Sequence, residues 1–380
     1  MTTTINKEQK NPNVPNLRFP EFEGEWQEKR LSDIADLSKG IGISKDQLSA
    51  DGEPCILYGE LYTKYKSETI NEVISKTNID NTKLVKSKAN DVIIPCSGET
   101  AEEIATARCV LKDDILLGGD LNIIRLHGYD GSFMSYQLNG KRKYDIAKVA
   151  QGVSVVHLYG EHLKNIKTIN PSLNEQKKIA NLLSLLDERI STQNKIIEKL
   201  QSLIKGLSIS LTTKENPNTV ISQCLECHSS TLQESEVLPN GLYKVFGANG
   251  LIGYTNNSQM CGEAILIIKD GSGVGTTSYA QGEFSVIGTL NYLTVIGNYD
   301  LRYLYFALSM FNFQPYKIGM AIPHIYFKDY SRAKIYCPSF TEQKRIANVL
   351  GKVESKLLLE QELIMSFNQQ KRYLLSQMFI

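Results

Sequence analysis

Two stretches of the chain carry apolar residues at alternating steps of four and three positions. This spacing places one narrow apolar seam along a helix, as the a and d positions do in a coiled coil. It predicts two long helices, at residues 171–212 and 338–380. The seam residues are Ile179, Leu183, Leu186, Ile190, Gln193, Ile197, Leu200, Ile204, Leu207 and Leu211 in the first helix, and Ile346, Leu350, Val353, Leu357, Glu360, Ile364, Phe367, Lys371, Leu374 and Met378 in the second.

The two helical stretches are copies of one another. PSLNEQKKIANLL begins at Pro171 and PSFTEQKRIANVL at Pro338, with nine of thirteen positions identical at an offset of 167. Ser followed three residues later by Glu is a capping-box pattern, which marks a helix start. Upstream, GVSVVHLY and GMAIPHIY keep the same offset. The chain therefore repeats one plan, a variable module followed by a shared helix.

The order of the parts predicts how the helices pair. A seam on a rod of roughly 58 Å must be buried, and two matching seams whose helices are joined through a module must run antiparallel. The modules are then expected at opposite ends of the rod, related by a pseudo-two-fold axis, as in proteins that read two DNA half-sites. The polar seam residues Gln193 and Glu360 either fix this register or lie at an exposed edge, and both interpretations stay open.

Each module is predicted to be a small mixed α/β domain, which makes the fold class α+β. The modules span residues 17–170 and 213–337, and a flexible tail is expected at 1–16. Short β-rich runs alternate with turns that contain Gly and Ser. The expected strands are 55–61, 91–96 and 121–126, then 242–247, 264–269, 284–288 and 290–297, and the expected helices are 31–37, 133–149 and 301–311.

Composition limits the kind of partner and the compartment. Lys plus Arg number 42 and Asp plus Glu 41, so the net charge of +1 gives no sign of a nucleic-acid partner, and a DNA-binding face would have to be a local patch. No apolar run reaches the roughly 18 residues that span a bilayer. Seven scattered cysteines without an export signal favour reduced thiols. A cytoplasmic protein is expected.

The repeated motifs resemble those of a known family. P-S-x-x-E-Q-K-[KR]-I-A, preceded by G-x-x-x-x-H-[LI]-Y and opening a coiled-coil helix, is similar to the shared regions of the specificity subunits of Type I restriction-modification enzymes. W-x-x-x-x-L-S-D-I at 26–34 resembles the start of a target-recognition domain. YKVFGANGLIGY at 243–254 and IIKDGSGVG at 267–275 are similar to segments of such domains. The resemblance covers nearly the whole chain after about Asn13.

The resemblance implies a DNA-reading subunit that is not itself an enzyme. Each module would read one half of a bipartite double-stranded target, while the helices set the spacer and dock two methyltransferase subunits. S-adenosylmethionine would bind those subunits, and ATP and Mg²⁺ would bind two restriction or motor subunits, so no cofactor is expected here. The sequence holds neither a G-x-x-x-x-G-K-[ST] loop nor an N-P-P-[FY] motif. The rival hypotheses are a scaffold with two non-DNA modules and an enzyme in its own right.

Several polar loop residues are candidates for DNA contacts through phosphates or base edges. Turns between strands, solvated loops and, for the two histidines, a structural role where module meets helix are the competing interpretations. The first-module candidates are Lys39, Tyr58, Lys64, Lys66, Ser97, Glu99, Thr100, Arg108 and His157. The second-module candidates are Asn249, Tyr254, Lys269, Ser272, Thr276, Thr277 and His324.

Partner contacts are expected on the helices. The candidates come from the repeated motif and from leucines that fall off the seam: Glu175, Gln176, Glu342, Gln343, Leu358, Leu359 and Leu375. No catalytic or metal-binding residue is predicted. Cys224, Cys227 and His228 spell the haem-attachment pattern C-x-x-C-H, and zinc with Cys261 is an alternative, but incidental thiols are the favoured interpretation because haem attachment needs export.

Overall fold

A computed structural model describes residues 13–80, 82–152 and 155–380. The chain divides into two compact units. Unit 1 comprises Met1–Gln193 and Ile364–Ile380, and unit 2 comprises Asn194–Leu363. Most of the expected tail, residues 1–12, lies outside the described residues. Asn13 is already part of unit 1, because its carbonyl accepts a hydrogen bond from the Trp26 amide at 2.9 Å.

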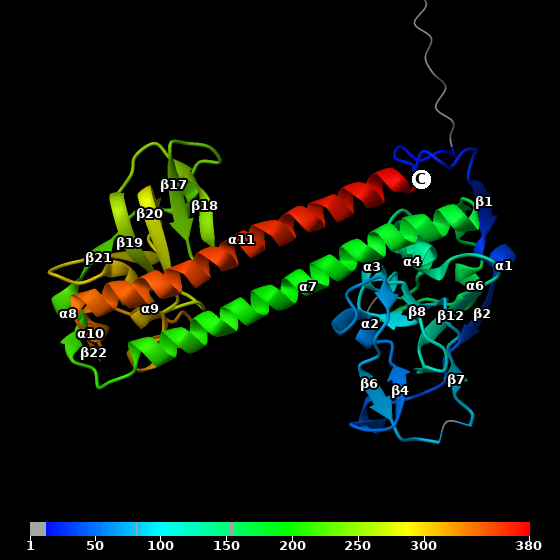
Figure 1. Cartoon of the computed structure of the whole chain (residues 1–380), viewed down its shortest axis with the longest axis horizontal. Helices are drawn as coiled ribbons and strands as arrows, with labels where there is room; N and C mark the ends of the chain where they lie inside the picture. Colours follow the sequence, from blue (N-terminus) through cyan, green and yellow to red (C-terminus); the bar gives the residue numbers. More distant parts are fainter. Residues whose placement is uncertain (1–12, 81, 153–154) are drawn as a thin grey trace, which may run out of the picture. The chain divides into compact units, whose positions relative to one another are not determined.

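The two long helices are α7 (Leu173–Thr212) and α11 (Phe340–Met378), shown in Figure 1. In unit 1 the start of α7 shares a core with the end of α11, through Ile179, Leu183 and Met378. In unit 2 the end of α7 shares a core with the start of α11, through Leu207 and Leu350. Within each unit the helices therefore run antiparallel, as predicted.

The two polar seam residues are buried. Gln193 is 5% exposed and Glu360 is 7% exposed. The interpretation that these residues lie at an exposed edge is therefore wrong for both. Lys356 forms an ion pair with Glu360 one helical turn away. Buried polar groups at seam positions favour one register over others at some cost in stability, which is the remaining interpretation.

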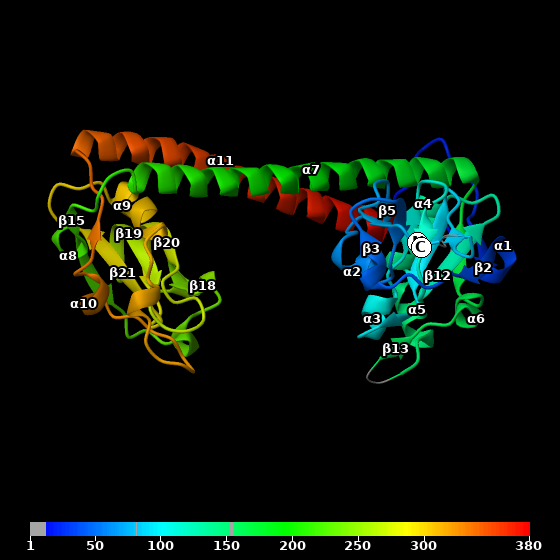
Figure 2. The same cartoon turned by 90° about the horizontal axis from the view of Figure 1, so that it is seen from below.

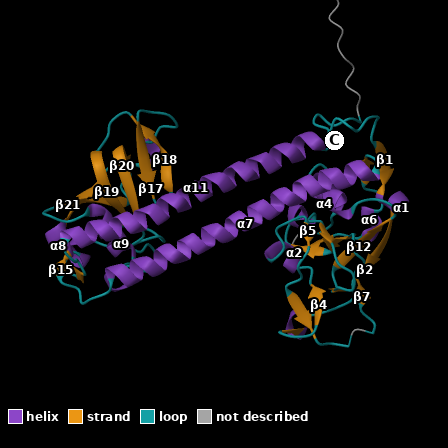
Figure 3. Ribbon diagram, in the orientation of Figure 1, coloured by secondary structure: helices purple, strands orange, loops and turns teal. Residues whose placement is uncertain are grey.

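Unit 1 carries two five-stranded sheets and several short helices (Figure 3). The strands are β1 (Gln27–Arg30), β2 (Ala35–Lys39), β3 (Leu48–Ser49), β4 (Glu53–Ile56), β5 (Thr69–Ile70), β6 (Ser75–Thr77), β7 (Val85–Lys86), β8 (Asp91–Pro95), β9 (Ser97–Gly98), β10 (Arg108–Val110), β11 (Leu116–Leu117), β12 (Leu121–Leu126), β13 (Val156–His157) and β14 (Lys167–Asn170). The helices besides α7 and α11 are α1 (Leu31–Ile34), η1 (Lys45–Gln47), α2 (Glu60–Thr63), α3 (Ala101–Ile104), α4 (Gly131–Asn139), α5 (Lys143–Val149) and α6 (Gly160–Leu163).

Unit 2 is built around one six-stranded sheet. Its strands are β15 (Thr219–Val220), β16 (Leu225–Ser229), β17 (Tyr243–Gly247), β18 (Gly250–Thr255), β19 (Met260–Ile268), β20 (Thr277–Val286), β21 (Leu290–Val295) and β22 (Lys334–Ile335). Its shorter helices are α8 (Ile221–Cys224), η2 (Glu234–Glu236), α9 (Leu301–Ser309), η3 (Gln314–Tyr316) and α10 (Phe327–Tyr330).

The internal repeat extends into the sheets. The main sheet of unit 1 has the order β2-β12-β8-β10-β5, and that of unit 2 has β16-β21-β19-β20-β17-β18. The first three pairings are antiparallel and the fourth is parallel in both sheets. Backbone hydrogen bonds define this topology, so it persists where sequence identity has faded. The two modules are therefore variants of one fold.

One helix in each module joins the sheet to the long helices. In unit 1, α4 follows β12, with Phe133 and Tyr136 in the core shared with α7 and Met134 and Leu138 in the core under the sheet. In unit 2, α9 follows β21 and belongs to a core that includes both the sheet and the long helices. Figure 2 shows α4 and α9 beneath α7 in their respective units.

Some local expectations were wrong in extent. The helix expected at 133–149 is two helices, α4 and α5, because the chain turns at Gly140, whose amide closes α4 on the Tyr136 carbonyl. The helix expected at 31–37 ends at Ile34, where β2 begins. Residues 60–63 are helical rather than the end of a strand. In each case the apolar run continues across an element boundary, so periodicity alone could not locate it.

Candidate nucleic-acid interface

The glutamine of the repeated motif ties each module to its helix. Gln176 Oε1 accepts from the Asp130 amide at 2.9 Å, and its Nε2 donates to the Pro171 carbonyl at 2.8 Å. Gln343 makes the same pair of bonds, with Asp300 and the Pro338 carbonyl. Asp130 and Asp300 cap α4 and α9. Both glutamines are buried. The partner contact expected for them is therefore corrected: they form internal hydrogen bonds that hold each module to its long helix.

Loss of either pair of glutamine hydrogen bonds is expected to destabilise the unit that contains it. Gln176→Ala and Gln343→Ala each leave a backbone amide and a carbonyl without partners, which costs about 1–3 kcal/mol. Urea denaturation followed by circular dichroism measures the loss as a lower unfolding midpoint. Gln369→Ala, at an exposed position of α11, is the matched control and should leave the midpoint unchanged. Equal midpoints for all three variants would contradict the assigned role.

The glutamate of the repeated motif behaves differently in the two units. Glu175 is buried and accepts from Arg18 Nε at 2.8 Å and from Trp26 Nε1 at 3.3 Å. Its side-chain hydrogen bond is the largest influence that raises the pKa of Arg18. Glu342 pairs with Arg345 on its own helix, at 2.6 Å. Only the serine half of each predicted capping box is present, at 3.4 Å. The Glu175 partner contact is thus also corrected, and Glu342 keeps an accessible carboxylate.

The off-seam leucines differ in exposure. Leu358 and Leu359 on α11 are exposed. Leu375 is partly buried and packs against the core that holds Trp26 and Phe133. The two exposed leucines retain the surface that a partner contact needs, whereas Leu375 contributes mainly to unit 1.

In unit 1 the structure brings together Lys39, Ser97 and His157 from three segments. His157 Nδ1 lies 3.3 Å from Ser97 Oγ, where β13 pairs with β9. The His157 ring lies 6.3 Å from the Tyr159 ring, and Lys39 Nζ lies 5.8 Å above that ring. These residues, called the His157 cluster, combine a cation, a hydroxyl and aromatic faces. In Figure 2, β13 lies on the side of unit 1 remote from α7.

A hydrogen bond from a partly buried tyrosine supports the Ser97 backbone in the His157 cluster. Tyr62 donates its hydroxyl to the Ser97 carbonyl at 3.1 Å, and burial raises the pKa of this phenol. The Cys96 thiol is also buried, which raises its pKa to about 11. At neutral pH both groups are uncharged, so the cluster presents the Lys39 cation without an adjacent thiolate or phenolate.

Unit 2 has an equivalent cluster around His324. The His324 amide donates to the Ile318 carbonyl at 2.8 Å, and the amide of Ile325 donates to the Lys269 carbonyl at 2.9 Å. The His324 ring lies 5.0 Å from the Tyr326 ring, with Lys328 Nζ 5.2 Å from the same ring. Lys269 Nζ forms an ion pair with Asp270 at 3.2 Å. The His324 cluster repeats the histidine and tyrosine of unit 1 on the same backbone frame, whereas its lysine comes from α10 rather than from the first long strand of the module.

A shallow groove lies beside the turn that carries Thr276 and Thr277. It is also lined by Asn312, Gln314 and Lys317, which no pattern in the sequence had indicated. The turn packs on the following segment, since a Cβ at Gly275 would lie 2.9 Å from Phe313 Cβ. Hydroxyl, amide and ammonium groups are the donors and acceptors that read base edges. Ser272, exposed in the same turn, completes the second-module candidates near this groove.

Other first-module candidates are engaged within the protein. Arg108 is buried and donates to the carbonyls of Tyr65 and Ala107 at 3.1 and 3.0 Å, so its expected DNA contact is corrected to an internal one. Lys64 Nζ pairs with Glu60 at 2.6 Å and with Ser75 Oγ at 2.7 Å. Thr100 caps α3. Tyr58, Lys66 and Glu99 are exposed, and Asn249 and Tyr254 lie on the hairpin formed by β17 and β18.

The C-x-x-C-H segment has local partners. His228 stacks on Tyr292 at 4.9 Å and its Nε2 lies 2.9 Å from Thr294 Oγ1. Cys224 is buried, Cys261 is exposed, and all seven cysteines are free thiols. Among residues 13–80, 82–152 and 155–380, no group of three or more His, Cys, Asp or Glu side chains could hold a metal ion. No helix in the same described part is long and apolar enough to cross a membrane.

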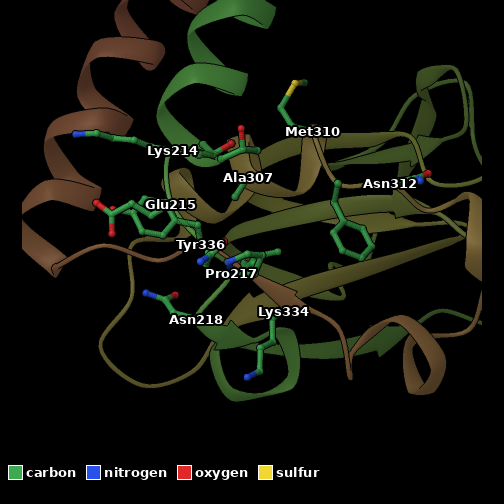
Figure 4. A pocket seen from close by; sticks show the side chains of 14 residues that line it. Lys214, Glu215, Pro217, Asn218, Ala307, Met310, Asn312, Lys334 and Tyr336 are labelled. Carbon is green, nitrogen blue, oxygen red and sulfur yellow. The ribbon is translucent and has the colours of Figure 1, made fainter.

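A pocket of about 900 Å³ lies at the module–helix junction of unit 2 (Figure 4). It is lined by residues 212–218 together with α9, the segment after it and β22. In unit 1 the residues at the corresponding junction are large: Trp26 and Phe379 both lie against Phe133, at 5.8 and 5.1 Å between ring centroids. The repeat places Thr212 where unit 1 has Phe379, which leaves the space open.

The chain thus contains two modules of one fold, and hydrogen bonds hold each module to the paired helices. Each module exposes a cluster of histidine, tyrosine and lysine, so the protein has two similar surfaces. The model of the Type I restriction modification DNA specificity domain matches residues 23–202 and 226–368. The chain therefore belongs to this family, which is the DNA-recognition component of Type I restriction-modification systems. The family resemblance stated from the sequence is confirmed.

Two relatives agree with this assignment, and a solved structure agrees with the fold. The specificity subunit of the Type I restriction enzyme MjaVIII from Methanocaldococcus jannaschii is 30% identical over 209 residues, 55% of this chain and 46% of the relative. The EcoprrI specificity subunit from Escherichia coli is 25% identical over 114 residues, 30% of this chain and 28% of the relative. Each match thus spans less than half of the relative. The crystal structure of the Type I S subunit from M. genitalium has a TM-score of 0.74 at 18% identity, covering 97% of this chain and 99% of that one, which confirms the fold.

Proposed function

We propose that this chain reads a bipartite double-stranded DNA target, one half-site with each module, and performs no catalysis itself. The observation that carries the proposal is the recurrence of one surface cluster, around His157 in unit 1 and His324 in unit 2. A bipartite reader needs two surfaces of one kind whose neighbouring loops differ. The groove with Thr276, Asn312 and Lys317 supplies such a loop set in unit 2.

The division of labour within the interface follows from side-chain chemistry. Lys39 and Lys328, whose ammonium groups lie over exposed tyrosine rings, suit phosphate contacts that set position. Hydroxyl and amide side chains at the turns suit base edges. Because the two modules are joined, binding of one half-site raises the effective concentration of the other module at its own half-site.

The proposal extends to the partners that the family resemblance implies. Two methyltransferase subunits would supply S-adenosylmethionine chemistry, and two restriction subunits would use ATP and Mg²⁺, so this chain would need no cofactor. The exposed pair Leu358 and Leu359 and the accessible carboxylate of Glu342 support docking on α11. The proposed role within the complex is to direct methylation to a sequence.

Genome-wide adenine methylation tests the proposal. A host that expresses this chain together with its partner methyltransferase subunit is compared with a host that lacks only this chain. The expected result is a bipartite methylated motif that disappears with the deletion. Unchanged methylation, or none in either host despite an active methyltransferase, would instead favour a scaffold without DNA-reading function.

Cluster variants should affect one half-site each. Lys39→Ala with His157→Ala is expected to relax or weaken recognition of one half-site, and His324→Ala with Lys328→Ala that of the other, because each pair lies on a different module. Loss of one phosphate contact should also lower the slope of log affinity against log salt by about 1. Methylation sequencing and binding titrations in varied salt are the measurements.

His127→Ala is the matched control for these cluster variants, because His127 is exposed and pairs with Asp36 away from the cluster. It should leave both half-sites unchanged. If the two cluster pairs altered the same half-site, or if neither altered any, the assignment of one half-site to each cluster would be wrong.

A further inference from the structure

Residues 318–322 of unit 2 present apolar side chains to solvent. Met320 is 103% exposed and Ile322 is 68% exposed, and Ile318 is exposed as well. Covering a side chain of this size is worth about 1.5–3 kcal/mol, so Met320 and Ile322, two positions apart, could contribute binding energy that the fold does not use. In Figure 2 this loop, drawn in orange before α10, lies on the side of unit 2 remote from α7.

The backbone holds these side chains outward. Ile318 and His324 exchange two backbone hydrogen bonds, of 3.0 and 2.8 Å, which close the loop at its base. The Pro323 carbonyl accepts from the Gly271 amide at 2.9 Å and fastens the loop to the neighbouring turn. Gly319 has φ of +87°, and a Cβ there would lie 2.5 Å from the Ile322 carbonyl oxygen. A loop fixed in this way loses little conformational freedom when it binds.

The surroundings of the loop are polar and basic. Lys317 precedes it and lines the groove with Thr276 and Gln314. Lys269 and Asp270, which pair with each other, lie at the base through the bridge between Asp270 and His324. Lys328 lies beyond Tyr326. An apolar tip with cations on both flanks suits a duplex, whose bases offer apolar faces between two rows of phosphates.

We propose that this loop acts as a wedge, with Met320 inserted between two stacked base pairs of the DNA that unit 2 binds and Ile322 packed against the displaced base. The inference rests on the proposed DNA-reading function and adds a mode of recognition to it. Apolar wedges of this size unstack one step and kink a duplex by about 20–90°. The step would favour a deformable pyrimidine–purine sequence, so unit 2 would read shape as well as base edges.

The test uses this chain assembled with its methyltransferase subunits and a duplex that carries the methylated motif. 2-Aminopurine is placed in turn at each position of the unit 2 half-site, because its fluorescence rises when a base loses its stacking neighbour. The expected result is a rise of several fold at one step. Met320→Ala should abolish this rise and weaken binding about tenfold, whereas Met320→Leu should preserve it.

Met365→Ala is the matched control, because Met365 is an exposed methionine outside the loop, and it should leave both readouts unchanged. The wedge is overturned if no position brightens, or if Met320→Ala brightens like the parent. It is equally overturned if the loss in affinity vanishes when thymine is replaced by uracil, since Met320 would then contact a methyl group. If the methylated motif is found but no base loses its stacking, only the wedge proposal is wrong. If no methylated motif is found, the proposed function is wrong.

Discussion

Replacing Lys371 by Met is expected to lower the free energy of unfolding by about 3 kcal/mol. Lys371 Nζ lies 2.6 Å from Glu68 and 2.6 Å from Asp187, and Tyr136 donates its hydroxyl to Asp187 at 2.7 Å. These groups join α11, α7, α4 and the segment before β5 within unit 1. Met has a similar length but leaves the buried Asp187 and the largely buried Glu68 without their counter-charge, so denaturation by urea should show a lower midpoint.

The loss should depend on pH. Burial, the largest influence, raises the pKa of Glu68, and Lys371 opposes that rise. Burial also disfavours the charge of Lys371, but Glu68 and Asp187 outweigh it and raise its pKa. Without Lys371 the pKa of Glu68 rises further in the folded state, which then binds more protons than the unfolded state. The stability of the variant should therefore increase as pH falls below this raised pKa, and its deficit should shrink.

Lys371→Arg is the control for that variant, because it keeps the positive charge. Its deficit should be smaller than that of the Met variant and should not shrink on acidification. A Met variant as stable as the parent at pH 7 would mean that the two carboxylates find other compensation, and the ion-pair cluster would then not hold the module to the helices.

Insertion of one heptad into each long helix is expected to lengthen the spacer of the methylated motif and leave both half-sites unchanged. Units 1 and 2 are connected by the chain only at Gln193–Asn194 in α7 and at Leu363–Ile364 in α11. Seven residues added at each point keep the phase of the apolar seam. They add about 10 Å of helix, which corresponds to roughly three base pairs at 3.4 Å each.

Methylation sequencing of the host reads the new spacer directly. A heptad placed in α11 alone is the control, since it breaks the match between the seams and should abolish directed methylation. An unchanged spacer in the doubly extended protein would show that the helices do not set the distance between half-sites. Altered half-sites would show that recognition is not confined to the modules.

The long helices were the most predictable part of the fold. Their seam repeats over ten positions, and the copy at an offset of 167 supplies a second reading of the same pattern. The shared strand order of the two main sheets could not be predicted, because pairing between β8 and β10 or between β19 and β20 uses backbone groups that any residue provides. The same topology can thus outlast the sequence that first encoded it.

The candidate interface was predictable only in part. His157 and His324 were found because the repeat preserves them, and Lys39 and Ser97 do lie beside His157. The same repeat misled the interpretation of Gln176 and Gln343, since a shared internal contact preserves residues as well as a shared partner does. Arg108 was misjudged because its burial depends on distant chain segments that no local pattern reveals.

The composition of unit 1 bears on the order in which the protein is made. Its core contains Met378 and Phe379, which belong to the last segment of the sequence, alongside Trp26 and Phe133 from the first module. Unit 2 is complete once residue 363 has been added. The core of unit 2 can therefore be complete while the core that the first module shares with the long helices still lacks the end of α11. Domains generally fold in the order of their synthesis, and this shared core of unit 1 cannot follow that order.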